Sequence, residues 1–496
     1  MRCTVLVDAG ALPQWKHDCI EAMRAAYDVE TLSREHHGAR NSLVRRVLGG
    51  RMLHPVALAS SSTASLNSDF ILDLRSSAPD ADVAAESAPY WYFCDGDGAP
   101  LGDLPGAAEI ANGSPTFTLQ LRTRQPDASM ETLRTGTFKL LYSYGRSLEI
   151  ALNECCRWPA IARPSTLPQK RAAQASSLPE RFSGIALLWY VARAFFAHAY
   201  AHLLLDARWE VGLIAGSPED FLRDDFVPDV RWVRETSGFF ADPFVVTMSD
   251  RRYVLGERLD GKTRNGFIAC LEIGENGQVL KDSTVLRSST HLSYPYVFAH
   301  DGAWYMVPEN AQAKRAILYR AIEAPYHWEP LATVVDGVGS CDNTIVRYAD
   351  RWWLFCTHPS RDANLNLFLY HAQDLHGPWT AHAANPVKTD IRSARPAGTP
   401  FVVDGVLYRP AQNCVRSYGD AIAFNRITAL DEETFSEEVV ATFTRRNAGK
   451  PNQGVHTISH TNGTVAIDCK TVTRAGGRLV RQRLSQLVTR ALSLAT

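Results

Sequence analysis

The sequence predicts an α/β domain followed by an all-β propeller of five blades. Two patterns predict this architecture. Up to about residue 150, short apolar strands alternate with helical spacing, and from about residue 209 a unit of roughly 50 residues recurs five times. At about 150 residues per domain, a chain of 496 residues has room for two or three domains. Its 21% charged and 10% aromatic residues argue against a disordered or fibrous chain.

Charge and cysteine usage narrow the class of protein. The 52 Lys and Arg residues are balanced by 53 Asp and Glu residues, which argues against a nucleic-acid partner. The ten cysteines form no C-x-x-C motif, and the start of the chain lacks the long apolar run of a secretory signal. Free thiols are typical of a reducing compartment, so we expect a cytoplasmic protein. No G-x-G-x-x-G and no metal-ligand spacing is present, and we expect no cofactor and no metal.

The first domain is expected over residues 1–156, with an open, largely parallel sheet. Buried strands are predicted at Cys3–Val7 and Asp69–Leu74, and apolar residues recur at helical spacing from Ala11 to Tyr27. Further strands are expected over residues 114–122 and 137–142.

A linker and an apolar helix are expected over residues 157–208. The apolar run 185–205 is long enough to span a bilayer. However, Arg193 lies near its centre, where it costs about 2.5–3.5 kcal/mol on insertion scales. Three alternatives follow: a helix packed between domains, a helix lying flat in a membrane surface, and a true span. We expect a soluble or peripherally attached protein at the inner face of the membrane, and a helical tail over residues 476–496.

The repeat fills residues 209–475. Four of its five copies continue into a polar turn and an aromatic-rich strand, as in Trp304–Val307 and Trp352–Phe355. Units of several strands without a helix are typical of propeller blades, and the alternative is a β-sandwich of short strands. The aligned first strands, at spacings of 52, 48, 57 and 56 residues, are Asp242–Val246, Tyr294–Phe298, Asp342–Val346, Thr399–Val403 and Val455–Ser459.

Polar residues recur at equivalent positions of these units. In a propeller the first strand of each blade lines the central channel and the second returns beside it, so the start of one and the end of the other meet at one mouth. Carboxylates that meet there push each other's pKa values apart, which is how a site obtains an acid and a base. For any single residue the alternative is a turn cap. The residues expected at the mouth are Asp242, Glu257, Tyr294, Glu309, Asp342, His358, Arg395, Gln412, His456 and Asp468.

Two arginines of the fourth repeat suggest a phosphate ligand. A guanidinium grips phosphate bidentately, so Arg395 and Arg409 are predicted to hold the phosphate of a sugar donor. The alternative for Arg409 is an ion pair with Asp404 or Asp420. If the arginines hold phosphate, the reaction is glycosyl transfer or phosphorolysis.

Two segments, Phe240–Phe244 and Gly377–Thr380, resemble the five-bladed glycosidase clan of arabinanases, xylosidases and levansucrases. The resemblance implies that Asp242 is a base or nucleophile and that Asp342 tunes it. The acid of that clan is a later glutamate, but Ser393–Gly398 contains none. This departure argues against simple hydrolysis.

A further resemblance covers the whole propeller region, about half of the chain. The segments that carry it are Ala241–Phe244, Trp304–Glu309, Trp352–Phe355, Ala394–Gly398 and Tyr408–Gln412. They are similar to the N-terminal propeller region of the plant glucosamine inositolphosphorylceramide transferases and their bacterial relatives. In the plant proteins the established transferase fold lies in a separate C-terminal domain. The resemblance therefore implies glycan chemistry.

We expect a carbohydrate-active enzyme, namely a glycosyltransferase of surface glycan or glycolipid biosynthesis. Its partners would be a phosphate-activated donor such as a nucleotide sugar and a glycan or glycolipid acceptor. Asp242 would deprotonate the acceptor hydroxyl, with Asp342 or Glu309 adjusting its pKa. One alternative is a glycoside hydrolase with Glu309 as its acid. The other is a non-catalytic glycan-binding propeller, in which Tyr294, Tyr296 and Trp304 stack on sugar rings.

The N-terminal half carries a weaker resemblance. The segments Tyr90–Asp97, Gly106–Gly113 and Leu133–Thr137 follow the order of a folate-dependent formyltransferase domain. That family uses an Asn, a His and an Asp, but Cys94 and Arg134 stand where the histidine and the aspartate motifs would be. The resemblance therefore implies a degenerate formyltransferase-like domain without formyl transfer.

Overall fold

A computed structural model describes residues 1–8, 11–34, 52, 55–56, 68–75, 88–101, 105–141, 143–162, 203–233, 239–444, 447 and 454–477, with isolated positions between 189 and 200 and at 480 and 483. The chain divides into two compact units, Met1–Ala199 and Tyr200–Thr496. Within the described parts, all ten cysteines are free and buried, as the sequence predicts.

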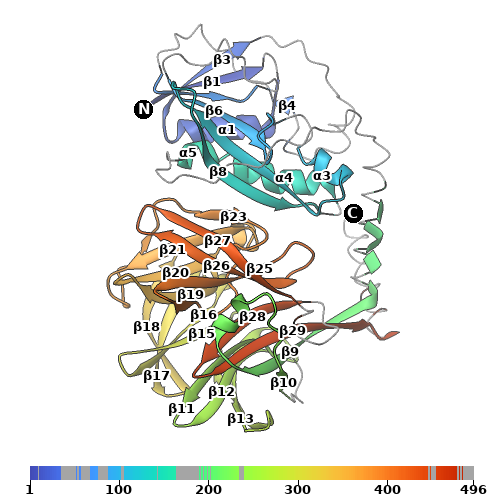
Figure 1. The fold of residues 1–496 in the computed structure, drawn as a ribbon, viewed down its shortest axis with the longest axis vertical. Helices are drawn as coiled ribbons and strands as arrows, with labels where there is room; N and C mark the ends of the chain where they lie inside the picture. Colours follow the sequence, from blue (N-terminus) through green and yellow to red (C-terminus); the bar gives the residue numbers. More distant parts are fainter. Residues whose placement is uncertain are drawn as a thin grey trace. The chain divides into compact units, whose positions relative to one another are not determined.

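The first unit is built on a sheet with strand order β3-β1-β5-β6-β7-β8 (Figure 1). Its first four strands are parallel, and β7 and β8 add antiparallel to β6. The strands are β1 Arg2–Asp8, β3 Asp28–Arg34, β5 Phe70–Asp73, β6 Tyr90–Asp95, β7 Thr116–Arg124 and β8 Met130–Lys139, with a small separate pair β2 Leu12–Pro13 and β4 Pro55–Val56. The helices are α1 Gln14–Arg24, α3 Ala107–Ala111, α4 Tyr144–Cys155 and α5 Trp158–Ile161.

These elements follow from local sequence. The helix expected from Ala11 begins only after Pro13, which lacks the N–H that a helix interior needs. Strand β7 alternates buried and half-buried residues along its length, so one face packs on the core. The strands predicted at Cys3–Val7, Asp69–Leu74 and 114–122 are found with small shifts in their bounds, whereas only residues 137–139 of the segment 137–142 are in a strand, at the end of β8. The described residues of this unit are mostly strands, and a formyltransferase-like fold stays a prediction.

The second unit is a propeller-like arrangement of antiparallel sheets (Figure 1). Three sheets follow one another along the chain: β11 Ala241–Met248 to β14 Val279–Leu286, β15 Ser293–His300 to β18 His327–Asp336, and β24 Phe401–Val403 to β27 Phe435–Thr444. Their inner strands are β12 Arg251–Leu259, β13 Gly266–Ile273, β16 Ala303–Glu309, β17 Arg315–Glu323, β25 Val406–Asn413 and β26 Ala421–Leu430. Between the second and third sheets, β19 Cys341–Tyr348, β20 Arg351–Thr357, β21 Asn366–Ala372 and β22 Thr380–Ala381 pair in the same antiparallel order, and β23 Lys388–Asp390 also pairs with β21.

The remaining sheet joins the two ends of this unit. Strands β9 Leu205–Ala215 and β10 Val230–Trp232 pair with β29 Thr464–Arg474, which in turn pairs with β28 Val455–Thr461. First strands of different sheets pack against one another: β11 contacts β15 and β28, and β15 contacts β19. Short 3-10 turns occur at Pro218–Leu222, Ala311–Ala313 and Pro359–Arg361. This closure of the ring by both chain ends agrees with the repeat found in the sequence.

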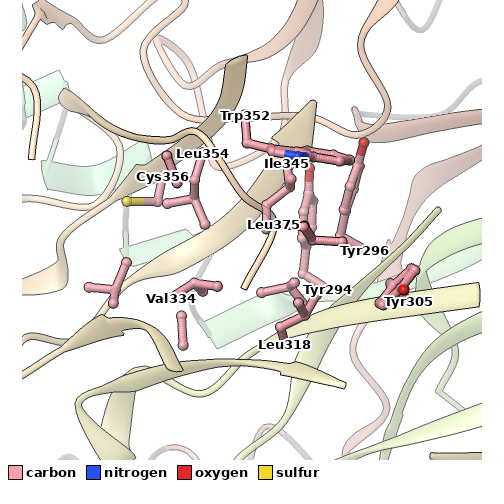
Figure 2. Close-up of a cluster of buried hydrophobic side chains, with 14 of the residues drawn as sticks. Tyr294, Tyr296, Tyr305, Leu318, Val334, Ile345, Trp352, Leu354, Cys356 and Leu375 are labelled. Carbon is pink, nitrogen blue, oxygen red and sulfur yellow. The ribbon is translucent and has the colours of Figure 1, made fainter. Parts of the chain in front are cut away.

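Large side chains fill the spaces between sheets. Tyr294, Tyr296 and Leu318 of one sheet meet Ile345 and Trp352 of the next in a buried cluster (Figure 2). Burying apolar area contributes about 25 cal/mol per Å², so these contacts hold neighbouring sheets together. Because Tyr294 and Tyr296 are packed here, with exposures of 0% and 3%, they do not offer the sugar platform that the binding-module alternative assigns to such aromatics.

The apolar run 185–205 is described only in part. Its described positions before Leu205, where β9 begins, are helical, and Trp189, Phe195 and Phe196 are exposed by 73%, 56% and 70%. Among the described residues, no helix combines the length and the apolar character needed to cross a membrane. The rest of this run, and most of the tail 476–496 that was expected to be helical, lie outside the described residues.

Candidate functional site

The first strands of the sheets share a bulge that aims particular side chains. Pairing shifts register between Ala241 and Phe244 in β11, and equivalent shifts occur in β15, β19 and β28. The first residue inside the shifted segment has a left-handed backbone in three strands, with φ of 52° at Asp242, 42° at Tyr294 and 51° at Asp342. Such φ values are uncommon outside glycine, and bulges often re-aim side chains next to functional sites.

The same register corrects the alignment of the last repeat. Ala241 pairs with Glu257 in the first sheet, and Val455 pairs with Cys469 in the last. The equivalent of Asp242 is therefore His456, one position after the Val455 that the sequence alignment matched to it. Because β11 and β28 carry the same bulge, the offset lies in the sequence alignment, which matched Val455 to Asp242.

Asp242, His456 and Asp468 form a buried triad. His456 Nε2 lies 2.9 Å from Asp242 Oδ1, and His456 Nδ1 lies 2.8 Å from Asp468. Asp468 also accepts hydrogen bonds from the backbone N–H groups of Asp242, His456 and Thr457. The Thr457 hydroxyl donates to Asp242 Oδ1 at 3.0 Å. The Trp209 ring covers the imidazole at a centroid distance of 4.0 Å.

Each ionised group of this triad stabilises the charge of its neighbours. Burial alone would lower the pKa of His456, but the carboxylates of Asp468 and Asp242 outweigh it and raise that pKa to about 10. Burial would raise the pKa of Asp242, yet the His456 imidazolium and the Thr457 hydroxyl lower it. Asp242 is thus a stable, weakly basic carboxylate, which does not suit the role of base predicted for it.

A second cluster lies around Asp342. Its carboxylate receives two bonds from Arg395, at 2.5 Å and 3.0 Å, and one from Gln412 Nε2 at 2.9 Å. The backbone N–H of Asp342 donates to Glu309 Oε2 at 3.1 Å, and Arg395 Nη2 lies 3.9 Å from the same oxygen. The Arg395 guanidinium also stands 5.0 Å from the centre of the Tyr418 ring. The guanidinium predicted to bind phosphate is therefore engaged by a carboxylate.

Glu309 is the group of this cluster that is suited to proton transfer. Burial first, and then the charge of Asp342, raise its pKa to about 8, although Arg395 partly offsets them. Its side chain is 14% exposed, against 4% for Asp342. A carboxyl group with a pKa near neutrality can both give and take a proton at physiological pH.

Glu257 forms a third pair with His291. The carboxylate lies 3.1 Å from His291 Nε2, and burial raises the pKa of Glu257. His291 Nδ1 accepts a hydrogen bond from the Gly266 N–H at 2.9 Å, so this nitrogen is unprotonated and Nε2 donates to Glu257. His291 was not predicted from the sequence. Its position two residues before β15, at the same end of the sheet as Glu257, is the signal that could have revealed it.

Two other expected mouth residues, Tyr294 and His358, have internal partners. Tyr294 is fully buried, and its hydroxyl accepts from the Gly398 N–H and bonds Thr344. His358 stacks on Phe368 at 3.9 Å, and burial lowers its pKa to about 4, so it is neutral. These residues support the walls of the mouth from within rather than line its surface.

Arg409 is likewise committed within its own sheet. Its guanidinium pairs with Glu437 at 2.5 Å and donates to the carbonyls of Ser393 and Ala394, and the residue is 0% exposed. The ion pair foreseen as an alternative exists, but its partner is Glu437 on β27 and not Asp404 or Asp420. The phosphate-binding role predicted for Arg409 finds no support in this placement.

The mouth as a whole is lined by acids. Five carboxyl groups, from Asp242, Glu257, Glu309, Asp342 and Asp468, face two strong cations, Arg395 and His456. Among the described residues, the triad is also the group whose ligand atoms, within 4.8 Å of one another, could hold a metal ion. Because both imidazole nitrogens already bind carboxylates, the observed geometry is that of a shared imidazolium.

Sequence comparison finds proteins that are similar to the propeller region. The profile of a family described as glucosamine inositolphosphorylceramide transferase 1, N-terminal, matches residues 229–462. The protein named glucosamine inositolphosphorylceramide transferase 1 of Oryza sativa subsp. japonica is 32% identical over 207 residues, which cover 40% of this chain and 28% of that protein. The Arabidopsis thaliana protein of the same name is 33% identical over 207 residues, covering 40% and 27%. The chain resembles these proteins and spans less than a third of their length.

Comparison with solved structures gives weaker similarities. A thermostable family-43 glycoside hydrolase matches with a TM-score of 0.34 and 12% identity, over 40% of this chain and 75% of the other. A family 117 glycoside hydrolase from Zobellia galactanivorans matches with a TM-score of 0.35 and 11% identity, over 54% of this chain and 91% of the other.

Proposed function

We propose that this protein is a sugar-transferring enzyme of glycan or glycolipid biosynthesis, and that the sugar binds at the acid-lined mouth of the propeller. The observation that carries the proposal is Glu309, a carboxyl group with a pKa of about 8 beside the Asp342–Arg395 pair. The likeness of residues 229–462 to proteins named as transferases supports the class of reaction.

In this proposal Glu309, and not Asp242, takes the proton from the acceptor hydroxyl. General bases work best when their pKa is close to the working pH, and Asp242 has a lowered pKa while Glu309 has a raised one. The bidentate pairing of Asp342 with Arg395 keeps a negative charge beside Glu309 in a fixed position. The His456 triad stabilises the strand starts that form the site.

The donor is a phosphate-activated sugar and the acceptor a glycan or glycolipid. The names of the rice and Arabidopsis relatives contain both an amino sugar and a phosphorylated lipid. A lipid acceptor requires contact with a membrane surface, and the exposed aromatic side chains of Trp189, Phe195 and Phe196 suit the headgroup region. The proposed location is therefore the cytoplasm, with peripheral attachment to the inner face of the membrane.

The proposal also assigns a fold to each of the two units. We count the β19–β22 strands as a fifth blade, since they share the antiparallel order of the other sheets. We assign the first unit as a degenerate formyltransferase-like domain, supported by the parallel order β3-β1-β5-β6.

Glu309→Gln tests the function. The full chain is incubated with nucleotide sugars and an inositolphosphoceramide acceptor, and transferred and released sugar are measured by mass spectrometry. General acid–base catalysis contributes about 10²- to 10⁴-fold, so Glu309→Gln should lose at least about 100-fold in turnover while it still binds the sugar. The control is Glu323→Gln, an exposed glutamate of the neighbouring strand β17, which should keep full turnover.

The same assay separates the alternatives. A hydrolase with Glu309 as its acid releases free sugar instead of transferring it. A glycan-binding module gives neither product and binds sugar equally well in wild type and Glu309→Gln. Either result would overturn the proposed transfer.

A further inference from the structure

A second polar pocket lies at the rim of the propeller, beside the mouth. It has a volume of about 310 Å³ and is lined by the tip of the β12–β13 hairpin and by the segment that follows β14. Its polar lining residues are Asp260, Thr263, Asn265, Arg287, Ser288 and Ser289. We call this the rim pocket.

Most of the polar groups in the rim pocket can donate hydrogen bonds. Three hydroxyls, one amide and one guanidinium line it, against the single carboxylate of Asp260. The Arg287 side chain is 53% exposed and forms an ion pair with Asp260, with 3.7 Å between Nη1 and Oδ2, a distance longer than a hydrogen bond. Its guanidinium carbon lies 3.7 Å from the centre of the Phe267 ring, and both residues line the pocket.

The pocket is also the more basic part of this end of the propeller. The hairpin tip carries the exposed cations Lys262 and Arg264 in addition to Arg287. Asp260 Oδ1 is occupied by the backbone N–H groups of Lys262 and Thr263 and by the Thr263 hydroxyl. Lys262 and Arg264 do not line the pocket, but they make the hairpin tip beside it basic, which favours an anionic ligand, whereas the mouth is lined by acids.

The rim pocket and the mouth share one wall. Gly266 lines the pocket, and its N–H donates to His291 at the mouth. A Cβ on Gly266 would lie 2.9 Å from Glu257 Oε1 and 2.3 Å from the carbonyl oxygen of Leu292, so only glycine permits this close approach. The rim pocket therefore adjoins the Glu257–His291 pair across Gly266.

We propose that the rim pocket is a phosphate subsite, which binds the phosphate or diphosphate group of a ligand whose sugar lies in the mouth. This proposal rests on the proposed function and replaces the predicted phosphate contacts of Arg395 and Arg409. Those guanidiniums are held by Asp342 and Glu437. Arg287 presents its fork to solvent beside hydroxyl donors, which is the arrangement that suits bidentate binding of phosphate.

The test is a calorimetric titration of the full chain with inorganic pyrophosphate. Wild type should bind it saturably, and Arg287→Gln should weaken binding by about tenfold or more, since a charged bidentate contact is lost. The matched control is Arg251→Gln, an arginine at the opposite end of β12 that pairs with Glu272, and it should leave binding unchanged within about twofold. Arg287→Lys, which keeps the charge but loses the fork, should fall between wild type and Arg287→Gln.

Two soluble probes distinguish the source of the phosphate. Tighter binding of pyrophosphate than of myo-inositol 1-phosphate identifies the diphosphate of a donor, and the reverse order identifies the headgroup of a lipid acceptor. The proposal is overturned if wild type binds neither probe at millimolar concentration, or if Arg287→Gln binds both as wild type does. Glu309→Gln should keep phosphate binding. Arg287-dependent binding in a protein without sugar transfer would therefore refute the proposed function alone, and transfer without such binding would refute the subsite alone.

Discussion

Two aspartates at equivalent positions of the repeat have opposite surroundings. Asp242 shares a buried imidazolium with Asp468, and its side chain is 8% exposed. Asp342 pairs with the guanidinium of Arg395 and leaves the neighbouring Glu309 with a pKa raised to about 8. The same bulged backbone thus builds two different clusters. We call Asp242, His456 and Asp468 the closed cluster, because their charges neutralise one another. We call Asp342, Arg395 and Glu309 the open cluster, because Glu309 holds a proton near neutral pH. Partners from other strands, and not the repeat position itself, decide which carboxyl group can do chemistry.

The largest expected effect comes from removing the shared cation of the closed cluster. His456→Ala leaves two buried carboxylates facing each other, and breaking a buried ion pair in this way costs about 3–5 kcal/mol. Urea denaturation at pH 6 measures it. The control is His376→Ala, whose partner Asp374 is exposed, and it should change stability by less than about 0.5 kcal/mol.

The stability lost in His456→Ala should depend on pH, and the direction follows from the raised pKa of His456. The pKa of His456 is raised from 6.5 to about 10 on folding. Its contribution is therefore fully present below pH 6.5 and is lost as the pH rises through 10. The difference in unfolding free energy between wild type and His456→Ala should shrink over this window. A cost that is the same at pH 6 and pH 10 would show that the imidazole is neutral.

A smaller effect is expected when the open cluster loses its fixed negative charge. In Asp342→Asn the carboxylate that helps to raise the pKa of Glu309 is gone, and Arg395 is left to lower it. We expect the pKa of Glu309 to fall by about one unit or more, while burial keeps it above its ordinary value. The measurement is NMR titration of carboxyl-labelled glutamate, with the Glu309 signal assigned by its loss in Glu309→Gln.

Asp336→Asn is the matched control for this titration. Asp336 ends β18, is 67% exposed on its side chain and pairs with Arg315 at the surface. Its removal should leave the pKa of Glu309 unchanged, because solvent screens exposed charges. An equal shift in both variants would mean that the Asp342 charge has no special influence on Glu309.

Much of this comparison could be predicted from the sequence. The spacing of the repeat and the aromatic-rich second strands predict the sheets, and they assign Asp242, Glu309, Asp342 and Asp468 to one end of the propeller. Strand alternation carries this information because apolar residues must face neighbouring sheets.

The remaining features of the site depend on contacts between residues that are far apart in the sequence. The pairing of Val455 with Cys469 moves the last alignment to His456, and Arg409 pairs with Glu437, which lies 28 positions later on an outer strand. His456 and Asp242 are 214 positions apart in the numbering, and a single sequence does not tell which cation will neutralise which acid. The rim pocket could not be predicted from the sequence for the same reason, because two separate turns form it.

The smallest expected effect separates charge from packing within the closed cluster. Trp209 stacks on His456 at 4.0 Å and 35°, and an aromatic face attracts a cation by about 0.5–2 kcal/mol. Trp209→Leu should therefore cost about 1 kcal/mol beyond its lost burial. A double-mutant cycle with His456→Gln, measured by urea denaturation at pH 6, should give a coupling of about 0.5–1 kcal/mol between the two sites. A coupling near zero would mean that Trp209 only packs on the ring, and that the two carboxylates alone hold the proton on His456.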